Sequence, residues 1–205
     1  IVIGHTVVNK DDWKQLLKTL SISRKSSKII GDKISFLNDL ISRNMVVKID
    51  QDVLFASGKY TVDSATIAVI GKLFTPVADE INVFANKYPD FPLSLIITAK
   101  GYADATLIAE GSPLYKELKD RLKLKGTEPT AQEVNKELSN VRAQEVIGLF
   151  QQFSAGRSPD GSNLKKVSYL YEGKGDKFPD PKITDYTVDD PRRRVVLLFW
   201  SIFPD

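Results

Sequence analysis

The sequence contains no cysteine and only one histidine. The lack of cysteine excludes disulfides, thiolate metal sites and cysteine nucleophiles, but it leaves the redox compartment open because an oxidising space does not require disulfides. His5 lies near the start of the chain, so a histidine-based triad or zinc site has little support. We therefore expect no metal site and no cofactor.

Charge of one sign and long apolar runs are also scarce. The 29 basic residues nearly balance the 26 acidic ones, which leaves a net charge of +3. Such a balance is unlike that of a nucleic-acid-binding protein. No apolar run approaches the roughly 18 to 20 residues that a membrane-spanning helix needs. Because position 1 is Ile1 and not methionine, we expect a fragment, with a signal, lipid anchor or membrane helix left out before it.

The composition itself is that of a globular protein, with 42% hydrophobic and 27% charged residues. At 205 residues, we expect one domain at residues 46–205 and an N-terminal helical extension at residues 1–45. Apolar residues between positions 11 and 44 recur every three or four residues, which predicts an amphipathic helix. We expect a break in this helix near residues 21–27.

The domain itself shows alternating strand and helix patterns. Apolar runs predict strands at residues 45–50, 93–99, 167–171 and 194–199. Helices are expected from Asp63 and Ser64 to residue 87, from Ser112 to Lys125, and after Thr127 to residue 150. Residues 154–161 and 173–185 read as loops. The order βαβ(α)αββ predicts an α/β (α+β) sandwich, a mixed four-stranded sheet covered by helices, with one inserted helix.

Four separated pieces of the chain form an ordered motif. They are Leu54-Phe55-x-x-Gly58, Gly101-Tyr102-Ala103-Asp104, Asn135-x-x-Leu138-Ser139-x-x-Arg142-Ala143-x-x-Val146, and Gly173-x-Gly175 with Pro179. This set resembles the OmpA-like domain, and the similarity extends over about residues 46–199. Arg193-Arg194-Val195 is similar to the basic signature that ends this family.

The resemblance implies a noncatalytic, noncovalent grip on the diamino acid of a peptidoglycan stem peptide. Asp104 matches the family's aspartate and Arg142 its arginine. The pairing is chemically sound, because a guanidinium binds a carboxylate through two parallel hydrogen bonds and a carboxylate accepts from an ammonium group. Neither residue has to change protonation, so we expect a binding module and no enzyme.

Further ligand-binding candidates surround this pair. Asn135 can share a helix face with Arg142 and supply amide hydrogen bonds. Tyr102-Ala103 stands where the family usually has His-Thr, and Thr106 is expected to supply the missing hydroxyl. Arg193 and Arg194 are weaker candidates for a peptide or a phosphate-bearing wall polymer. An insertion at about residues 105–134 could cover the site, change its specificity or bind a partner.

Structural interpretations compete with the functional ones. Asp104 could be a solvated loop carboxylate, and Arg142 an ordinary surface residue of a helix. The basic run at residues 192–194 could be a solvated strand edge or an ion-pair hub with Asp189 and Asp190. Nucleic-acid binding by this run is the weakest interpretation.

The resemblance also implies a cellular setting. We expect a periplasmic protein that is membrane-anchored at full length, with peptidoglycan, a second copy of itself and a membrane protein as partners, as in MotB-type stators. An outer-membrane porin tail or a lipoprotein remains open. One alternative is a protein-interaction scaffold that has lost wall binding and uses the helix at residues 112–125. Another is a wall hydrolase that uses Asp104 with Glu110 or Glu137.

Overall fold

The computed structural model describes residues 10–42, 46–50, 54–55, 59–62, 64–124, 126–155, 157 and 163–205. The expectations for Gly58, Asp63, Lys125 and most of the loop at residues 156–161 lie outside this part. The chain divides into two compact units, Ile1–Asn44 and Met45–Asp205. Within the described part, no helix is long and apolar enough to cross a membrane.

The first unit contains helix α1 (Lys10–Ser42). The helix is continuous, so the break predicted near residues 21–27 is wrong. Serine lowers helix propensity only slightly, and this stretch holds no proline or glycine to interrupt the backbone hydrogen bonds.

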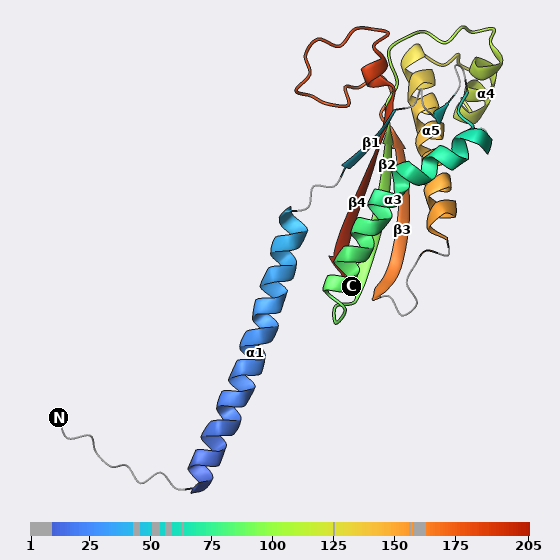
Figure 1. Cartoon of the computed structure of the whole chain (residues 1–205). Helices are drawn as coiled ribbons and strands as arrows, with labels where there is room; N and C mark the ends of the chain where they lie inside the picture. The colour runs from blue at the N-terminus through green and yellow to red at the C-terminus, as the bar shows by residue number, and fades with distance from the viewer. Residues whose placement is uncertain are drawn as a thin grey trace. The chain divides into compact units, whose positions relative to one another are not determined.

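The second unit is built on a mixed four-stranded sheet (Figure 1). Its strands are β1 (Val46–Asp50), β2 (Leu93–Gly101), β3 (Leu164–Gly173) and β4 (Val195–Pro204), in the order β1-β4-β2-β3. Strands β2 and β3 are parallel, while β4 pairs antiparallel with both β1 and β2. The predicted fold class is confirmed.

Helices α3 (Ser64–Lys87), α4 (Pro113–Leu122) and α5 (Ala131–Ser154) accompany the sheet, and the short helix η1 (Pro191–Arg193) precedes β4. Alternate residues of β2 are buried, so the strand has one inward face. That face carries Leu93, Leu95, Ile97 and Ala99. Helix α5 packs along β2 and β3, and α3 contacts β1 and α5 (Figure 1).

The inserted helix α4 begins as expected but ends early. Ser112 caps its start by accepting a hydrogen bond from the Tyr115 amide at 3.1 Å, and Pro113 occupies the first turn. The helix was expected to reach Lys125 but ends at Leu122, and Lys123 after it has a left-handed φ of 49°. The last turn closes there because the Lys123 amide binds the Asp120 carbonyl oxygen.

Helix α5 starts and ends later than predicted. Thr130 and Glu133 form a capping box, in which each side chain binds the backbone amide of the other. This box fixes the start of the helix at Ala131, whereas the sequence predicted a start directly after Thr127. The helix continues through Ser154, where a loop was expected. The inserted helix α4 packs against α5, where Leu118 of α4 contacts Val134 and Val141 of α5.

Candidate functional site

The candidate site lies where β2 and β3 end beneath the first half of α5. Gly101 and Gly173 are partners in the parallel pair of strands. A Cβ atom on Gly101 would lie 2.0 Å from the Ser139 carbonyl oxygen, and one on Gly173 would lie 2.4 Å from that of Lys136. Glycine is therefore required at both strand ends, because only glycine lets the helix backbone approach so closely.

Ser139 of α5 holds the next motif piece in place. Its hydroxyl donates to the Lys136 carbonyl oxygen at 2.8 Å and accepts from the Gly175 amide at 2.9 Å. Gly175 has φ of +63°, a left-handed conformation that favours glycine. The serine and the glycines of the motif thus position the segment after β3 and do not form a ligand-binding surface.

The loop after β2 is fixed by its backbone. The amides of Tyr102, Ala103 and Ala105 all donate hydrogen bonds of 2.8 to 2.9 Å to other segments. Their acceptors are the carbonyl oxygens of Val195, Gly175 and Val188. Asp104 therefore sits within a backbone that three separate segments hold in place.

The carboxylate of Asp104 is paired with Arg194. Its Oδ2 atom accepts from Arg194 Nη1 at 3.0 Å, and its Oδ1 atom accepts from the Thr106 amide at 3.2 Å. The side chains of Asp104 and Arg194 are 14% and 31% exposed. Thr106, predicted to act through its hydroxyl, contacts this carboxylate through its backbone. The pair presents both signs of charge to the surface in one place.

Arg142 is buried, with 7% of its surface exposed. Its Nε and Nη2 atoms donate to the Lys59 carbonyl oxygen at 3.3 and 3.1 Å. The guanidinium also lies 5.4 Å from the centre of the Phe55 ring. The interpretation of Arg142 as an ordinary surface residue is wrong, because these contacts draw it inward and join two of the four motif pieces.

Asn135 lies two turns before Arg142 on α5 and is also buried, with 4% exposed. Its Nδ2 atom donates to the Thr106 carbonyl oxygen at 3.3 Å. Thr106 in turn donates its amide to Asp104. Asn135 is therefore linked to the Asp104 carboxylate indirectly, through two hydrogen bonds made by the backbone of Thr106.

Arg193 holds the long loop that precedes η1. Its Nη1 atom donates to the Thr187 carbonyl oxygen at 3.0 Å, and its Nη2 atom binds the Asp176 carbonyl oxygen. The guanidinium lies 5.1 Å from the centre of the Phe178 ring, and the residue is only 5% exposed. The interpretation of the whole basic run as a solvated edge is therefore wrong for Arg193.

Arg192 forms the ion-pair hub, with partly different partners from those predicted. It binds Asp190 at 2.6 Å and Asp185 at 3.2 Å. Asp189 instead accepts from the Thr187 hydroxyl at 3.3 Å. Hydrogen bonds from Arg192 lower the pKa of Asp190 to about 2. The three consecutive arginines thus have different partners, and Arg194 is the one that contacts Asp104.

Tyr102 lies beside the site and is 9% exposed. Burial raises the pKa of its phenol, while nearby Lys174 acts in the opposite direction. The phenol is thus neutral at neutral pH and can act as a hydrogen-bonding group. Among the residues that the structure describes, no cluster of acidic or histidine side chains is placed to hold a metal ion.

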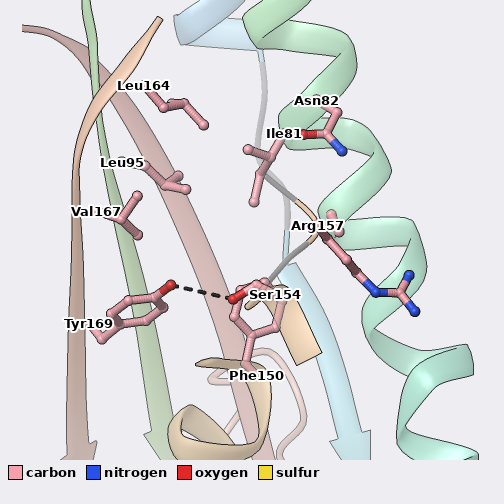
Figure 2. A pocket seen from close by; sticks show the side chains of 10 residues that line it. Ile81, Asn82, Leu95, Phe150, Ser154, Arg157, Leu164, Val167 and Tyr169 are labelled. Atoms are coloured by element: carbon pink, nitrogen blue, oxygen red, sulfur yellow. Dashed lines mark hydrogen bonds between the residues drawn. The ribbon is translucent and has the colours of Figure 1, made fainter. Parts of the chain in front are cut away.

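A separate pocket opens between α3, α5 and the beginnings of β2 and β3 (Figure 2). Its cavity of about 60 Å³ is lined mainly by apolar side chains, including Ile81, Leu95 and Phe150. Leu95 lies near the start of β2, whereas Asp104 follows its end, roughly 20 to 30 Å away at the usual rise of a strand. This pocket belongs to the helix–sheet core and not to the Asp104 site.

No family model matches the sequence, and no curated protein does. Three solved structures show what the chain is similar to. The periplasmic domain of Helicobacter pylori MotB (residues 97–256) is 16% identical, with a TM-score of 0.43 over 76% of this chain and 81% of that one. The OmpA-like domain of FopA1 from Francisella tularensis is 18% identical, with a TM-score of 0.35 over 78% and 72%.

The cell wall anchor of the type VI secretion system (T6SS) from Pseudomonas aeruginosa is 20% identical, with a TM-score of 0.34 over 83% of this chain and 96% of that one. At such identities and scores this similarity carries no argument about the fold, the ligands or the function of this chain. One of the structures it is similar to is described as an OmpA-like domain, the family that the motifs of this chain resemble.

Proposed function

We propose that residues 46–205 bind the stem peptide of peptidoglycan without catalysis and so anchor a membrane-attached protein to the cell wall. The observation that supports this best is the partly exposed Asp104–Arg194 pair on a fixed loop. A diamino acid carries an ammonium and a carboxylate at one end, so its recognition needs one anion and one cation close together.

In this proposal Asp104 accepts from the ligand's ammonium group, and Arg194 donates to its carboxylate. A guanidinium suits this task because its planar set of donors matches the two oxygens of a carboxylate. The ligand would join or replace the existing ion pair. This exchange costs little because both side chains are partly hydrated and the loop backbone is already ordered.

The buried candidates take a positioning role. Asn135 supports the Thr106 carbonyl, Arg193 holds the loop before η1, and the Tyr102 amide binds the Val195 carbonyl oxygen and so fixes the loop that carries Asp104. Arg142 was the predicted cation, and direct contact of its guanidinium with the ligand's carboxylate is the second proposal for the cation. Substitutions at Arg142 and Arg194 can separate the two roles.

The proposal extends to the rest of the chain. Residues 1–45 serve as an extension that connects the wall-binding domain to a membrane anchor, as in MotB-like stators. The insertion at about residues 105–134 borders the site through Thr106 and shapes access to it. The protein then works in the periplasm, with a second copy and a membrane protein as further partners.

The test is a pull-down of the 205-residue chain with purified peptidoglycan sacculi, with free diaminopimelic acid as competitor. We expect the wild type to sediment with sacculi, to be released by the competitor, and to liberate no soluble fragments. Asp104→Asn and Arg194→Gln should each lose retention. Asp120→Asn, an exposed carboxylate on α4, is the matched control and should bind normally.

Retention of both variants at the wild-type level would refute the assignment of the site. Circular dichroism must show that each variant is folded, so that a loss of retention reports on binding. Release of muropeptides would instead support a hydrolase.

The scaffold alternative has one observation in its favour. Asn135 and Arg142 are buried, and Asp104 is already paired, so much of the expected ligand-binding chemistry is used inside the protein. The exposed face of α4 is strongly charged and could receive a partner protein. This alternative predicts that the folded wild type does not sediment with sacculi at all.

A further inference from the structure

Strand β3 forms one edge of the sheet (Figure 1). Within the part of the chain that the structure describes, β2 pairs with one side of β3 and no strand pairs with the other. The strand is ten residues long, whereas β1 at the opposite edge has five. A long free edge presents a row of backbone donors and acceptors to which another chain can pair.

Neighbouring residues at the end of β3 direct their backbone groups to opposite sides. The Lys174 amide, directly after the strand, donates to the Gly101 carbonyl oxygen of β2 at 2.8 Å. The Gly173 amide donates away from β2, to the Asn140 Oδ1 atom of α5 at 3.2 Å. Because this alternation continues along a strand, the even-numbered residues of β3 face β2 and the odd-numbered residues face outward.

The alternation places three residues at the free edge. Val167, Tyr169 and Tyr171 direct their amides and carbonyl oxygens outward, while Ser168 and Leu170 between them pair with β2. Among the residues that the structure describes, no hydrogen bond occupies the outward backbone groups of these three. The edge can therefore accept a further strand over residues 167–171.

The middle of this edge lacks the usual protection against pairing. Edge strands are commonly protected by charged residues, proline or a short length. The charged residues of β3 are near its two ends, and residues 167–171 contain neither a charge nor a proline. Leu170 and Tyr171 are 53% and 44% exposed. The edge is thus open to a partner strand.

A groove runs beside this edge, between β3 and helices α4 and α5. Its cavity of about 430 Å³ is within the range typical of ligand-binding sites. Tyr169 and Tyr171 line it from the strand, Tyr60 provides a third ring, and Gln144 and Gln151 of α5 supply amide groups. Because side chains alternate between the two faces of a sheet, a strand added to β3 would place every second side chain in this groove.

The charged groups of the groove and the edge favour an acidic ligand. Arg121 of α4 lines the groove, with its guanidinium 5.4 Å from the centre of the Tyr60 ring. Lys165 and Lys166 at the start of β3 are exposed. Glu145 is the carboxylate that lines the groove. Positive charge therefore predominates, and charge complementarity steers an acidic partner to it.

Two carboxylates near the groove are already hydrogen-bonded. Glu117 accepts from the Tyr60 hydroxyl, and Glu172 pairs with Lys174 at 2.5 Å. These contacts offset their charge, so they do little to repel an acidic ligand.

We propose that the free edge of β3 binds an extended, acidic segment of a partner protein as a fifth strand of the sheet. In this mode of recognition, main-chain hydrogen bonds provide affinity and pockets for alternate side chains provide specificity. Val167, Tyr169 and Tyr171 bond the segment's backbone, the groove receives its apolar side chains, and Arg121 binds a carboxylate. Asp104 and Arg194 do not line this groove, so it is a second binding site.

The probe is a library of random 12-residue peptides displayed on phage and selected on the 205-residue chain. We expect the selected peptides to be rich in acidic, β-branched and aromatic residues. Hydrogen exchange of the labelled chain, measured by NMR, should then show slower exchange of the Val167, Tyr169 and Tyr171 amides when a synthetic selected peptide is bound. The Ser168 and Leu170 amides should exchange slowly with or without the peptide. Failure to select a peptide, or slower exchange without this alternation, would overturn the proposal.

Substitutions test the backbone and the charge separately. Tyr171→Pro and Tyr171→Thr both remove the ring, but only proline removes the outward amide, a change that edge strands tolerate. Tyr171→Pro should bind the peptide about tenfold more weakly than Tyr171→Thr. Arg121→Glu should weaken binding, whereas Lys116→Glu, the same charge reversal on exposed α4 surface outside the groove, should change it little. Equal effects within both pairs of folded variants would contradict the proposal.

Other occupants of the edge give different results. Displacement of the peptide by soluble muropeptides would assign the groove to a wall ligand and overturn the proposal. A dimer that Tyr171→Pro makes monomeric, measured by sedimentation equilibrium, would assign the edge to a second copy and would also overturn it. Peptide binding needs no wall binding, and Tyr171→Pro should leave retention on sacculi unchanged. Failure of this site and failure of the Asp104 site are therefore distinguishable.

Discussion

Asp104 Oδ2 lies 3.0 Å from Arg194 Nη1, so the carboxylate that follows β2 is paired with the arginine that precedes β4. The two residues are 90 positions apart in sequence. The antiparallel pairing of β2 with β4 brings them together, because Gly101 at the end of β2 is opposite Val196 near the start of β4.

This ion pair should contribute little to folding. Its side chains are 14% and 31% exposed, and pairs in such positions are worth about 1 kcal/mol or less. A double-mutant cycle with Asp104→Asn and Arg194→Gln, followed by urea denaturation, should show a coupling energy of about 0.5 to 1 kcal/mol. A coupling of several kcal/mol would mean that the pair is structural and poorly suited to release its partners for a ligand.

Arg142 should be more important for stability than either of these residues. Arg142→Met removes the two hydrogen bonds to Lys59 and the contact with the Phe55 ring while keeping most of the side-chain volume. We expect a loss of about 2 kcal/mol in the free energy of unfolding, measured by urea denaturation. A variant with wild-type stability that no longer binds sacculi would instead show that Arg142 contacts the ligand directly.

Gly101 should tolerate no side chain. In Gly101→Ala the new Cβ would lie 2.0 Å from the Ser139 carbonyl oxygen, so α5 would have to move away from the sheet. We expect a loss of about 3 kcal/mol in thermal unfolding experiments. Gly148→Ala on α5 is the control, because nothing lies within 4 Å of its added Cβ, and it should be stabilising by about 0.5 to 1 kcal/mol. Similar effects of both changes would contradict the close packing.

Asp190 should make folding sensitive to acid. The pKa of this carboxyl is about 2 in the folded protein against an ordinary value of 3.8. A lowered pKa stabilises the folded state above the ordinary value, and this contribution disappears as the pH falls from about 4 to 2. Asp190→Asn should therefore lower the melting temperature near neutral pH, and the difference from wild type should shrink as the pH falls to about 2. A difference that is constant over this range would count against the pairing with Arg192, and Asp120→Asn serves as the control.

Local sequence determined most of the secondary structure. The apolar periodicity predicted the helices and strands, and Ser112 marked the start of α4. Such signals depend on a residue and its near neighbours, so they can be read from the chain. Gly101 and Gly173 were visible only as members of the motif, because the backbone atoms that approach them belong to Ser139 and Lys136, far away in the sequence.

Only the tertiary structure decided which charges meet. The sequence showed Asp104, Arg142, Arg193 and Arg194 as candidates, but it could not assign their partners. Arg142 turned inward because the Lys59 carbonyl oxygen and the Phe55 ring approach it, and Arg194 reached Asp104 because β4 pairs with β2. Charge pairing acts over a few ångströms and joins residues up to 90 positions apart, so it depends on sheet order and helix placement, which local pattern does not determine.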